Sequence, residues 1–284
     1  MFLWHQAIDT IAASPELPRM TGVASETQCA PSYHHEGALR AREQHCLFKY
    51  TLSGAGAFRD ARGVHRVPAG CGFLCTINDP ETAYFYPPDG QAAWTFVYAC
   101  IAGTVVRTMV ADMTPRSGPL YYLPGNRGIM AQLLDWGRAG GGRMELSVAE
   151  SARLTTDLLY ALLAAATAAE SGTEEARCVR QALDIIDAHL EERLTAGDVA
   201  DALHISREHF TRLFSQRMGQ CPYQYMLRRK VQQACIFLKE GRLANKEIAA
   251  RLGFSDPAHF TRAFKGVIGM SPQVFRLRGS MPSW

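Results

Sequence analysis

Two segments near the end of the chain share one pattern of apolar and polar positions. Residues 209–214 read His-Phe-Thr-Arg-Leu-Phe, and residues 259–264 read His-Phe-Thr-Arg-Ala-Phe. In both segments the apolar side chains recur at the spacing of one helix face, while Thr and Arg fall on the opposite face. A repeat of fixed period indicates that one supersecondary unit is used twice.

A shorter helix is predicted ahead of each segment, over residues 198–203 and 247–252. Ser206 in the first copy, and Ser255 or Asp256 in the second, can cap the longer helix that follows. A short helix, a tight turn and a longer helix with a polar outer face are typical of a helix-turn-helix. The alternative is a helical bundle whose charges are only solvated, but the same outward Thr-Arg pair in both copies favours the helix-turn-helix. The outward side chains are Arg207, Glu208, Thr211, Arg212 and Ser215, then Ala258, Thr261, Arg262 and Lys265.

A further helix is predicted between the two copies, over residues 222–239, and Gly241 ends it. Its length of about 27 Å would hold the two longer helices about one DNA turn, roughly 34 Å, apart. Arg228, Arg229 and Lys230 lie on this connector. They either contact phosphate or form an ordinary solvated surface, and the sequence leaves both readings open.

From about residue 176 to residue 278 the chain resembles the DNA-binding domain of the AraC/XylS family of bacterial transcription factors. The resemblance rests on the two copies, the connector and the closing segment Gly269-Met270-Ser271-Pro272-Gln273-Val274-Phe275-Arg276. It implies that both longer helices enter the major groove of double-stranded DNA. The base-reading positions that it implies are Glu208, Thr211, Arg212, Pro257, Ala258, Thr261 and Arg262. Because Pro257 and Ala258 are poor hydrogen-bonding residues, the second copy is expected to contact thymine methyl groups or only the backbone.

Between residues 38 and 101 the pattern changes to short segments rich in β-forming residues and separated by turns. Strands are predicted at residues 47–52, 57–59, 64–67, 72–77, 82–86 and 94–101. In the last of these, Trp94, Phe96, Tyr98 and Cys100 share one face. Such strands, with turn signals every 8–12 residues, predict a barrel or a sandwich. Residues 1–30, which contain Pro15, Pro18 and Gly22, are predicted to be weakly structured.

The spacing of Gly63, the Pro68-Ala69-Gly70 turn and the Trp94-x-Phe96-x-Tyr98 strand resembles the cupin-like effector-binding barrel of the same family. The resemblance implies a small ligand in the mouth of the barrel, among inward-facing aromatic rings. The alternative for each ring is that it only fills the core, since large rings mostly do so. The candidate ligand-binding residues are Lys49, as a polar anchor, and Tyr84, Trp94, Phe96 and Tyr98.

Several histidines and acidic residues raise the question of a catalytic metal. His34, His35 and Glu36 are followed by Glu43, His45 and His65. His34 and His35 are adjacent, so on a strand they would face opposite sides, and no histidine follows the Pro68-Ala69-Gly70 turn. We therefore predict no metal. Cys71 and Cys75 would lie roughly 13 Å apart on a strand, which disfavours a thiol sensor.

Residues 126–169 return to helical spacing. A short amphipathic helix is predicted before the Gly-rich break at residues 139–142, and a longer one over residues 147–169. The apolar stripe of the longer helix either packs on its own domain or, as the family resemblance implies, pairs two subunits. We favour the homodimer. Residues 171–175 are predicted to be a linker.

Charge is distributed unevenly along the chain of 284 residues. Residues 176–284 carry 17 Lys and Arg against 10 Asp and Glu, a net +7, while the remainder carries 13 against 17, a net −4. A basic C-terminal part suits a nucleic-acid-binding module. No basic segment precedes the apolar start of the chain, and no run of about 20 apolar residues exists. We therefore expect a cytoplasmic protein whose eight cysteines are reduced.

Together these patterns predict an α+β chain in three parts: a cupin-like effector-binding domain (1–125), a helical dimerisation segment with linker (126–175) and a double helix-turn-helix domain (176–284). The predicted function is transcription regulation, with DNA, a small-molecule effector such as a sugar and a second copy as partners. We further expect that the protein activates transcription and that RNA polymerase is one of its partners. No catalytic residue or cofactor is predicted. The alternatives are a metal-dependent cupin enzyme fused to a DNA-binding domain, and a regulator that responds to thiol oxidation or a partner protein.

Overall fold

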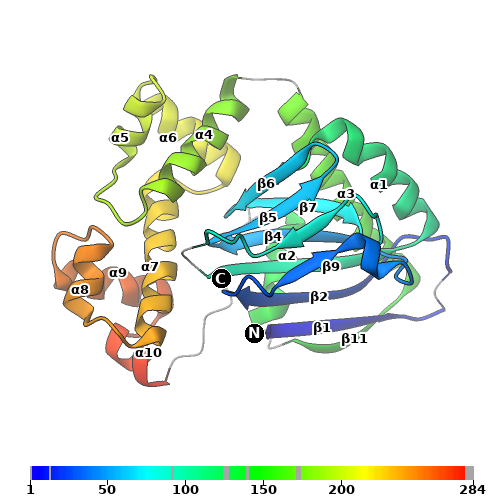
Figure 1. Cartoon of the computed structure of the whole chain (residues 1–284), viewed down its shortest axis with the longest axis horizontal. Helices are drawn as coiled ribbons and strands as arrows, with labels where there is room; N and C mark the ends of the chain where they lie inside the picture. The colour runs from blue at the N-terminus through cyan, green and yellow to red at the C-terminus, as the bar shows by residue number, and fades with distance from the viewer. Residues whose placement is uncertain are drawn as a thin grey trace. The chain divides into compact units, whose positions relative to one another are not determined.

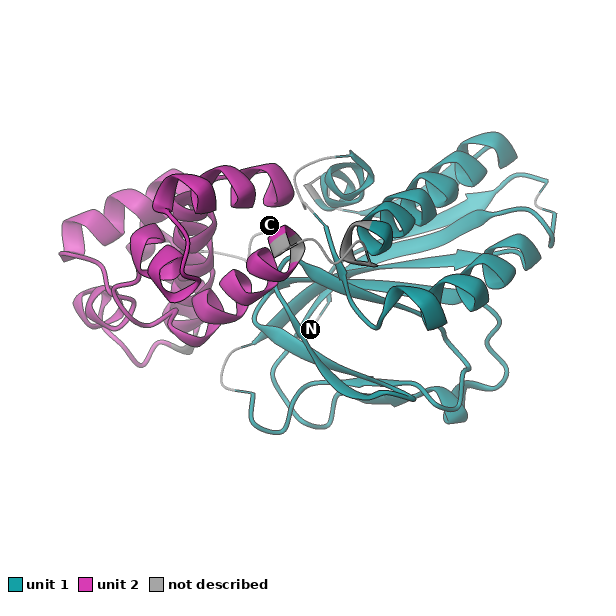
Figure 2. Cartoon of the chain, turned by 90° about the horizontal axis from the view of Figure 1, so that it is seen from above, with its two compact units in different colours: residues 1–173, 283 teal, residues 174–282, 284 magenta. Residues whose placement is uncertain are grey.

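The computed structural model describes residues 2–12, 14–90, 93–123, 128–138, 141–170 and 174–278. The chain divides into two compact units, residues 1–173 (unit 1) and residues 174–282 (unit 2) (Figure 2). Unit 1 combines β-sheets with helices, and the described part of unit 2 is helical (Figure 1). The predicted α+β class is therefore confirmed.

The strands of unit 1 form two sheets. The larger has the order β10-β7-β4-β9-β2-β1-β11, and the smaller has the order β3-β8-β5-β6. The strands are β1 (Phe2–Thr10), β2 (Arg19–Gln28), β3 (His34–Glu36), β4 (Cys46–Ser53), β5 (Ala55–Asp60), β6 (Gly63–Pro68), β7 (Cys71–Thr76), β8 (Ala83–Phe85), β9 (Trp94–Ala102), β10 (Tyr121–Tyr122) and β11 (Gly142–Leu146). The helices are the 3-10 helix η1 (Gly37–Arg40), α1 (Thr104–Ser117), α2 (Gly128–Arg138) and α3 (Val148–Glu170).

Strand alternation divides the interior of unit 1 into two cores. Along β9, Val97, Ala99 and Ile101 point to the core under the helices, whereas Trp94 and Phe96 point to the core between the two sheets. The predicted common facing of Trp94, Phe96, Tyr98 and Cys100 is thereby confirmed. The strands predicted at residues 57–59 and 64–67 form a hairpin, in which Asp60 pairs with Gly63 across a two-residue turn.

Three parts of unit 1 differ from the sequence-based expectation. Residues 1–30 are not weakly structured: β1 and β2 pair antiparallel, and Pro15 and Pro18 lie in the connection between them. Helix α1 was not predicted, although Val106, Val110 and Met113 give it a buried face. Residues 142–146 form β11, an edge strand parallel to β1, which starts at the last residue of the predicted break and was not predicted.

The apolar stripe of α3 packs within its own unit. Leu154, Leu158, Leu159, Leu162 and Ala166 are buried in the core with residues of β1, β2 and β9. The prediction that this stripe pairs two subunits is wrong for these side chains. Residues 128–170 belong to unit 1, so they do not form a separate segment.

Unit 2 contains two pairs of helices joined by one long helix. The helices are α4 (Glu174–Ala188), α5 (Ala196–Ala202), α6 (Arg207–Met218), α7 (Pro222–Glu240), α8 (Asn245–Arg251), α9 (Pro257–Ile268) and α10 (Pro272–Arg278). Helix α7 contacts α6 on one side of the repeat and α8, α9 and α10 on the other (Figure 1). Its buried residues Val231, Ala234, Cys235 and Leu238 form one core with the second pair.

Candidate nucleic-acid interface and ligand cavity

The two longer helices of unit 2 start from equivalent caps. The Ser206 hydroxyl accepts a hydrogen bond from the backbone N–H of His209 at 3.1 Å, and an Asp256 carboxylate oxygen accepts one from His259 at 2.7 Å. Each cap satisfies one of the backbone donors that a helix N-terminus leaves unpaired. The same helical phase is therefore fixed in α6 and α9.

The inner faces of the two copies repeat the same aromatic packing. Three rings follow one another edge to face, with centroid distances of 5.5 and 5.4 Å in the first copy and 5.7 and 5.5 Å in the second. The rings are Phe210, Phe214 and Tyr225 in the first copy, and Phe260, Phe264 and Phe275 in the second. Because these rings fix which side of each helix is buried, they also fix which side faces solvent.

The structure places the predicted DNA-binding residues on the solvent side of both helices. Thr211 is half-buried, and the others are exposed. Arg212 donates a hydrogen bond to the ring of His209 at 3.1 Å, and Thr261 donates one to the Pro257 carbonyl at 2.8 Å. The exposed residues are Arg207, Glu208 and Arg212 on α6, and Ala258, Thr261, Arg262 and Lys265 on α9.

Unit 1 contains a cavity of about 440 Å³ at the side of β4 that faces the smaller sheet. Lys49 on β4 is 1% exposed, and its Nζ donates a hydrogen bond to the Tyr33 hydroxyl at 2.7 Å. The amine lies 3.9–5.5 Å from the centroids of five aromatic rings. These rings belong to Tyr33, Tyr84, Trp94, Phe96 and Tyr98.

Of the five predicted ligand-binding residues, Lys49, Tyr84 and Tyr98 line this cavity, and Trp94 and Phe96 do not. Trp94 and Phe96 are fully buried in the core between the sheets. The Trp94 indole also donates a hydrogen bond to the Thr51 hydroxyl at 2.9 Å, which fixes the position of the ring. These two rings support the cavity from behind.

Charged and titratable groups surround the opening. Arg40 holds Glu43 through two hydrogen bonds of 2.5 and 2.7 Å and contacts the Tyr84 hydroxyl at 2.5 Å. The hydrogen bonds from Arg40 lower the pKa of Glu43. His35 stacks on Tyr84 with 5.0 Å between ring centroids, and its burial lowers its pKa to about 4. The cavity therefore has an aromatic interior and an ionic rim.

Sequence reasoning missed Tyr33, His35 and Arg40 as parts of this cavity. Tyr33 precedes β3, and it is held where it is because the Tyr86 N–H bonds to its carbonyl at 2.9 Å. That contact joins residues far apart in the chain, so periodicity carries no signal for it. The adjacency of His34 and His35 did predict their opposite facing: His34 pairs with Glu36 at 2.7 Å and stacks on Phe85.

The other side chains considered for a metal site or a thiol sensor lie apart from one another in the described part of the chain. His65 pairs with Asp60 at 2.8 Å, in the hairpin of the smaller sheet. Cys71 and Cys75 are both buried, and burial raises the pKa of the Cys75 thiol to about 12. Among the residues that the structure describes, no group of three or more His, Cys, Asp or Glu side chains is placed to hold a metal ion.

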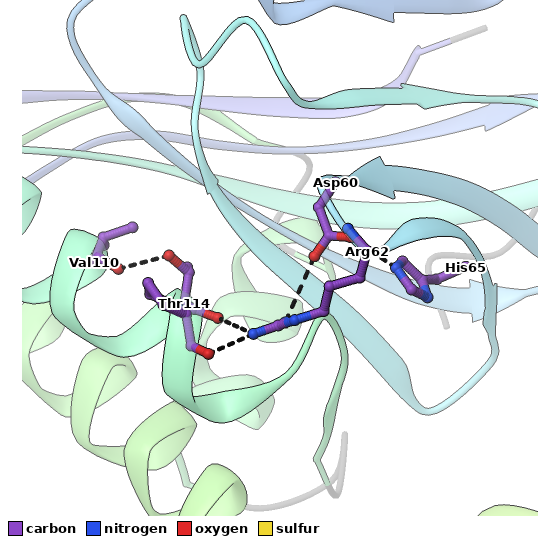
Figure 3. Close-up of polar contacts among 6 residues, drawn as sticks. Asp60, Arg62, His65, Val110 and Thr114 are labelled. Atoms are coloured by element: carbon purple, nitrogen blue, oxygen red, sulfur yellow. Dashed lines mark hydrogen bonds and ion pairs between the residues drawn. The ribbon is translucent and has the colours of Figure 1, made fainter.

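A second cavity of about 470 Å³ lies between the β5–β6 hairpin and α1. Arg62 in the hairpin turn donates hydrogen bonds to the carbonyls of Thr114 and Pro115, at 3.3 Å for Thr114 (Figure 3). Its guanidinium also lies 3.6 Å from an Asp60 carboxylate oxygen. A cation at the C-terminal end of a helix is stabilised by the helix dipole. Arg62 therefore joins the hairpin to α1, and its guanidinium is already hydrogen-bonded within the chain.

Comparison with known proteins points to the C-terminal unit. A family model described as a helix-turn-helix domain matches residues 199–278. The uncharacterized HTH-type transcriptional regulator YfiF of Bacillus subtilis is 40% identical over 88 residues, 31% of this chain and 28% of that protein. The MmsAB operon regulatory protein of Pseudomonas aeruginosa is 25% identical over 253 residues, 86% of this chain and 78% of that protein.

The C-terminal unit is therefore similar to the helix-turn-helix domains of transcription regulators, one of them named AraC-like. The crystal structure of a transcriptional regulator with an AraC-type DNA-binding domain from Chromobacterium violaceum is 26% identical, with a TM-score of 0.34. That match covers 37% of this chain and 95% of the other. The chain spans less than a third of the length of YfiF.

In unit 2 the basic run on α7 is divided between two environments. Arg229 is 5% exposed and pairs with Asp187 of α4 at 2.6 Å. Lys230 is 8% exposed and donates a hydrogen bond to the Glu192 carbonyl at 2.7 Å. These two cations tie α7 to the segment around α4, so they are not free for phosphate. Arg228 is exposed and keeps that role open.

Proposed function

We propose that the chain is a sequence-specific DNA-binding transcription regulator in which both helix pairs of unit 2 act as helix-turn-helix units. The observation that carries the proposal is the repeated placement of an outward Thr-Arg pair on two helices with equivalent N-caps and the same pair of inner phenylalanines. Thr211 with Arg212, and Thr261 with Arg262, then occupy the same position in each unit. A recognition helix presents such residues to base edges in the major groove.

The two units differ in the chemistry that they offer to DNA. Helix α6 presents Arg207, Glu208 and Arg212, which are suited to hydrogen-bonding base edges and phosphates. Helix α9 begins with Pro257 and the exposed Ala258, which suit contact with thymine methyl groups. Lys265, one helical turn beyond Thr261, adds a phosphate contact. The first unit therefore supplies more of the polar base recognition.

Helix α7 sets the spacing of the two units. Its 19 residues span about 28 Å, and it contacts α6 as well as α8 and α9. Two recognition helices held at opposite parts of such a spine match successive major grooves, which lie roughly 34 Å apart on one face of DNA. Two contacts hold α7 against the segment around α4. Arg229 pairs with Asp187, and Lys230 donates a hydrogen bond to the Glu192 carbonyl.

We also assign effector binding to the aromatic cavity of unit 1, as in a cupin-like barrel. Lys49, Tyr84 and Tyr98 would contact a small molecule such as a sugar or related metabolite, with Trp94 and Phe96 behind them. Aromatic walls with a few convergent polar groups are typical of small-molecule sites. Binding there would shift the population of conformations that bind DNA. The protein partners we propose are a second copy, through exposed side chains of α3 such as Tyr160, and RNA polymerase during activation.

Selection of preferred duplexes from a random-sequence library tests the DNA-binding proposal. We expect a preferred site with two conserved blocks about one helical turn apart and an affinity that falls steeply with salt. Recovery of no preferred sequence, at any salt concentration, would refute it. A thermal-shift screen of sugars and metabolites on the full chain tests the sensing proposal, and stabilisation by none of them would count against it.

A further inference from the structure

We propose that the Lys49 amine captures a small aldehyde or ketone in the unit 1 cavity as a reversible imine. The inference rests on the proposed function, because it gives a chemical class to the ligand that this cavity is proposed to hold. It follows from the placement of one primary amine at the wall of an aromatic cavity of about 440 Å³. The first 173 residues contain 12 arginines but only this one lysine, and a guanidinium does not form imines.

Lys49 lacks the partner that usually accompanies a buried cation. Its Nζ donates a hydrogen bond to the neutral Tyr33 hydroxyl at 2.7 Å. Among the described residues no ion pair joins it to a carboxylate. Glu26 acts on it only through its charge and is itself hydrogen-bonded to Gln28 at 2.8 Å. A buried ammonium without a paired carboxylate is costly, so the site favours loss of its proton.

Burial lowers the pKa of Lys49 to about 7, with the charge of Glu26 opposing the shift. At neutral pH a substantial fraction of the amines is then unprotonated. The aromatic rings favour the ammonium, so the two forms coexist. A lysine desolvated in an apolar pocket is an established kind of nucleophile toward carbonyl groups. The other titratable or charged groups that act on Lys49 are Glu26 on β2, Arg40 of η1, Cys75 on β7 and Cys100 on β9, with His35 on β3 nearby.

The reaction needs no reagent beyond the ligand. The nitrogen lone pair forms a bond to the carbonyl carbon, the C=O π electrons move to oxygen, and one N–H proton reaches that oxygen to give a carbinolamine. The carbinolamine hydroxyl then takes a proton and leaves as water while the C=N bond forms. Tyr33, whose pKa burial raises, stays protonated and is within hydrogen-bond distance of the nitrogen. Its hydroxyl can donate its own proton to the carbonyl or departing oxygen while it takes an N–H proton, so the phenol is neutral after each transfer.

Reductive trapping on the wild-type full chain tests the proposal without a variant. The protein is incubated at pH 7 with benzaldehyde or butanal and sodium cyanoborohydride, and the modified lysines are located by peptide mapping. We expect Lys49 to be modified at least tenfold faster than exposed Lys246, although Lys49 is buried. Modification of Lys246 with Lys49 left intact would overturn the proposal.

Two variants and two ligand analogues that cannot form an imine show whether the imine or the effector binding itself is at fault. Lys49→Arg should abolish labelling at position 49, and Lys246→Arg should leave labelling at Lys49 unchanged. Benzyl alcohol and benzoate are compared with benzaldehyde by thermal shift. Stabilisation by an analogue without trapping at Lys49 overturns the imine and leaves effector binding standing. If Lys49 is not trapped and no metabolite in the wider screen stabilises the protein, both the imine proposal and the effector-binding proposal are refuted.

Discussion

His204 and Gly253 occupy the same position in the two helix pairs, and both have a left-handed backbone, with φ of +56° and +65°. Each ends the turn after the shorter helix: the following residue, Ile205 or Phe254, bonds back to a helix carbonyl. Left-handed backbone costs a residue with a Cβ roughly 1–2 kcal/mol, and glycine avoids that cost. The first copy therefore carries backbone strain that the second copy lacks.

We predict that His204→Gly stabilises the first helix pair by about 0.5–1 kcal/mol, because relief of strain exceeds the added flexibility of the unfolded chain. Hydrogen exchange of peptides from α5 and α6 measures the change as slower exchange. Gly253→Ala is the matched control. Its Cβ would meet the Glu192 carbonyl oxygen at 2.6 Å, so the second pair should lose stability. Unchanged exchange in both variants would contradict the account of the turn.

A second difference between the copies lies in their shorter helices. The Thr195 hydroxyl accepts a hydrogen bond from the Asp198 N–H at 3.2 Å, and the Asp198 carboxylate accepts one from the Thr195 N–H at 2.7 Å. Ala244 has no hydroxyl, so only the Glu247 half of the capping box forms, at 2.6 Å. Ala244→Ser should stabilise α8 by about 1 kcal/mol. Hydrogen exchange in α8 checks this, and faster exchange would be the contrary result.

Acid should destabilise unit 1 partly through His35. Its folded-state pKa of about 4 lies below the ordinary 6.5, so between these values the unfolded chain binds more protons. Stability therefore rises with pH across this window and is lost as pH falls from 6.5 toward 4. Urea unfolding followed by tryptophan fluorescence reports mainly unit 1, because three of the four tryptophans, Trp4, Trp94 and Trp136, belong to it.

His35→Phe keeps a ring against Tyr84 but removes the titration. We expect a shallower loss of stability between pH 6.5 and 4 than in wild type, with the remainder due to groups such as His45 and Glu43, whose pKa values are also lowered. His65→Phe, in the hairpin away from this cavity, is the control. Identical pH profiles for wild type and His35→Phe would rule out this role.

Gly56 on β5 leaves the space that the Trp94 indole occupies. A Cβ at this position would lie 2.1 Å from Trp94 Cζ2, and Trp94 is fully buried. Gly56→Ala should therefore destabilise unit 1 by about 1–3 kcal/mol through overpacking. It should also disturb the ring behind Lys49. Tryptophan fluorescence during urea unfolding measures both effects, and a variant as stable as wild type would show that the indole has room to move.

The sequence carried strong signals for elements whose pattern is local. The alternation from Trp94 to Cys100 predicted which side of β9 faces the small sheet, and the repeated His-Phe-Thr-Arg predicted the phase of α6 and α9. The cavity was only half predictable. Lys49, Tyr84 and Tyr98 stand out by composition, whereas Tyr33 and Arg40 arrive there through contacts between distant residues.

Burial of charge was the least predictable property. Arg229 and Lys230 form a basic run with Arg228, and nothing in the run tells which face of α7 meets α4. The structure buries Arg229 against Asp187 and exposes Arg228. In the same way, β1 and β2 were missed because the prolines that suggested disorder occupy only their connection.

Equilibrium binding of a selected duplex by Arg212→Ala and Arg262→Ala tests the central claim of DNA recognition most directly. Arg217→Ala on α6, where the arginine pairs with Glu175 at 3.3 Å, is the matched control. We predict that each of the first two variants weakens binding by about 1–3 kcal/mol and relaxes preference at one base, while the control binds like wild type. Wild-type affinity and base preference in both Arg212→Ala and Arg262→Ala would contradict the account.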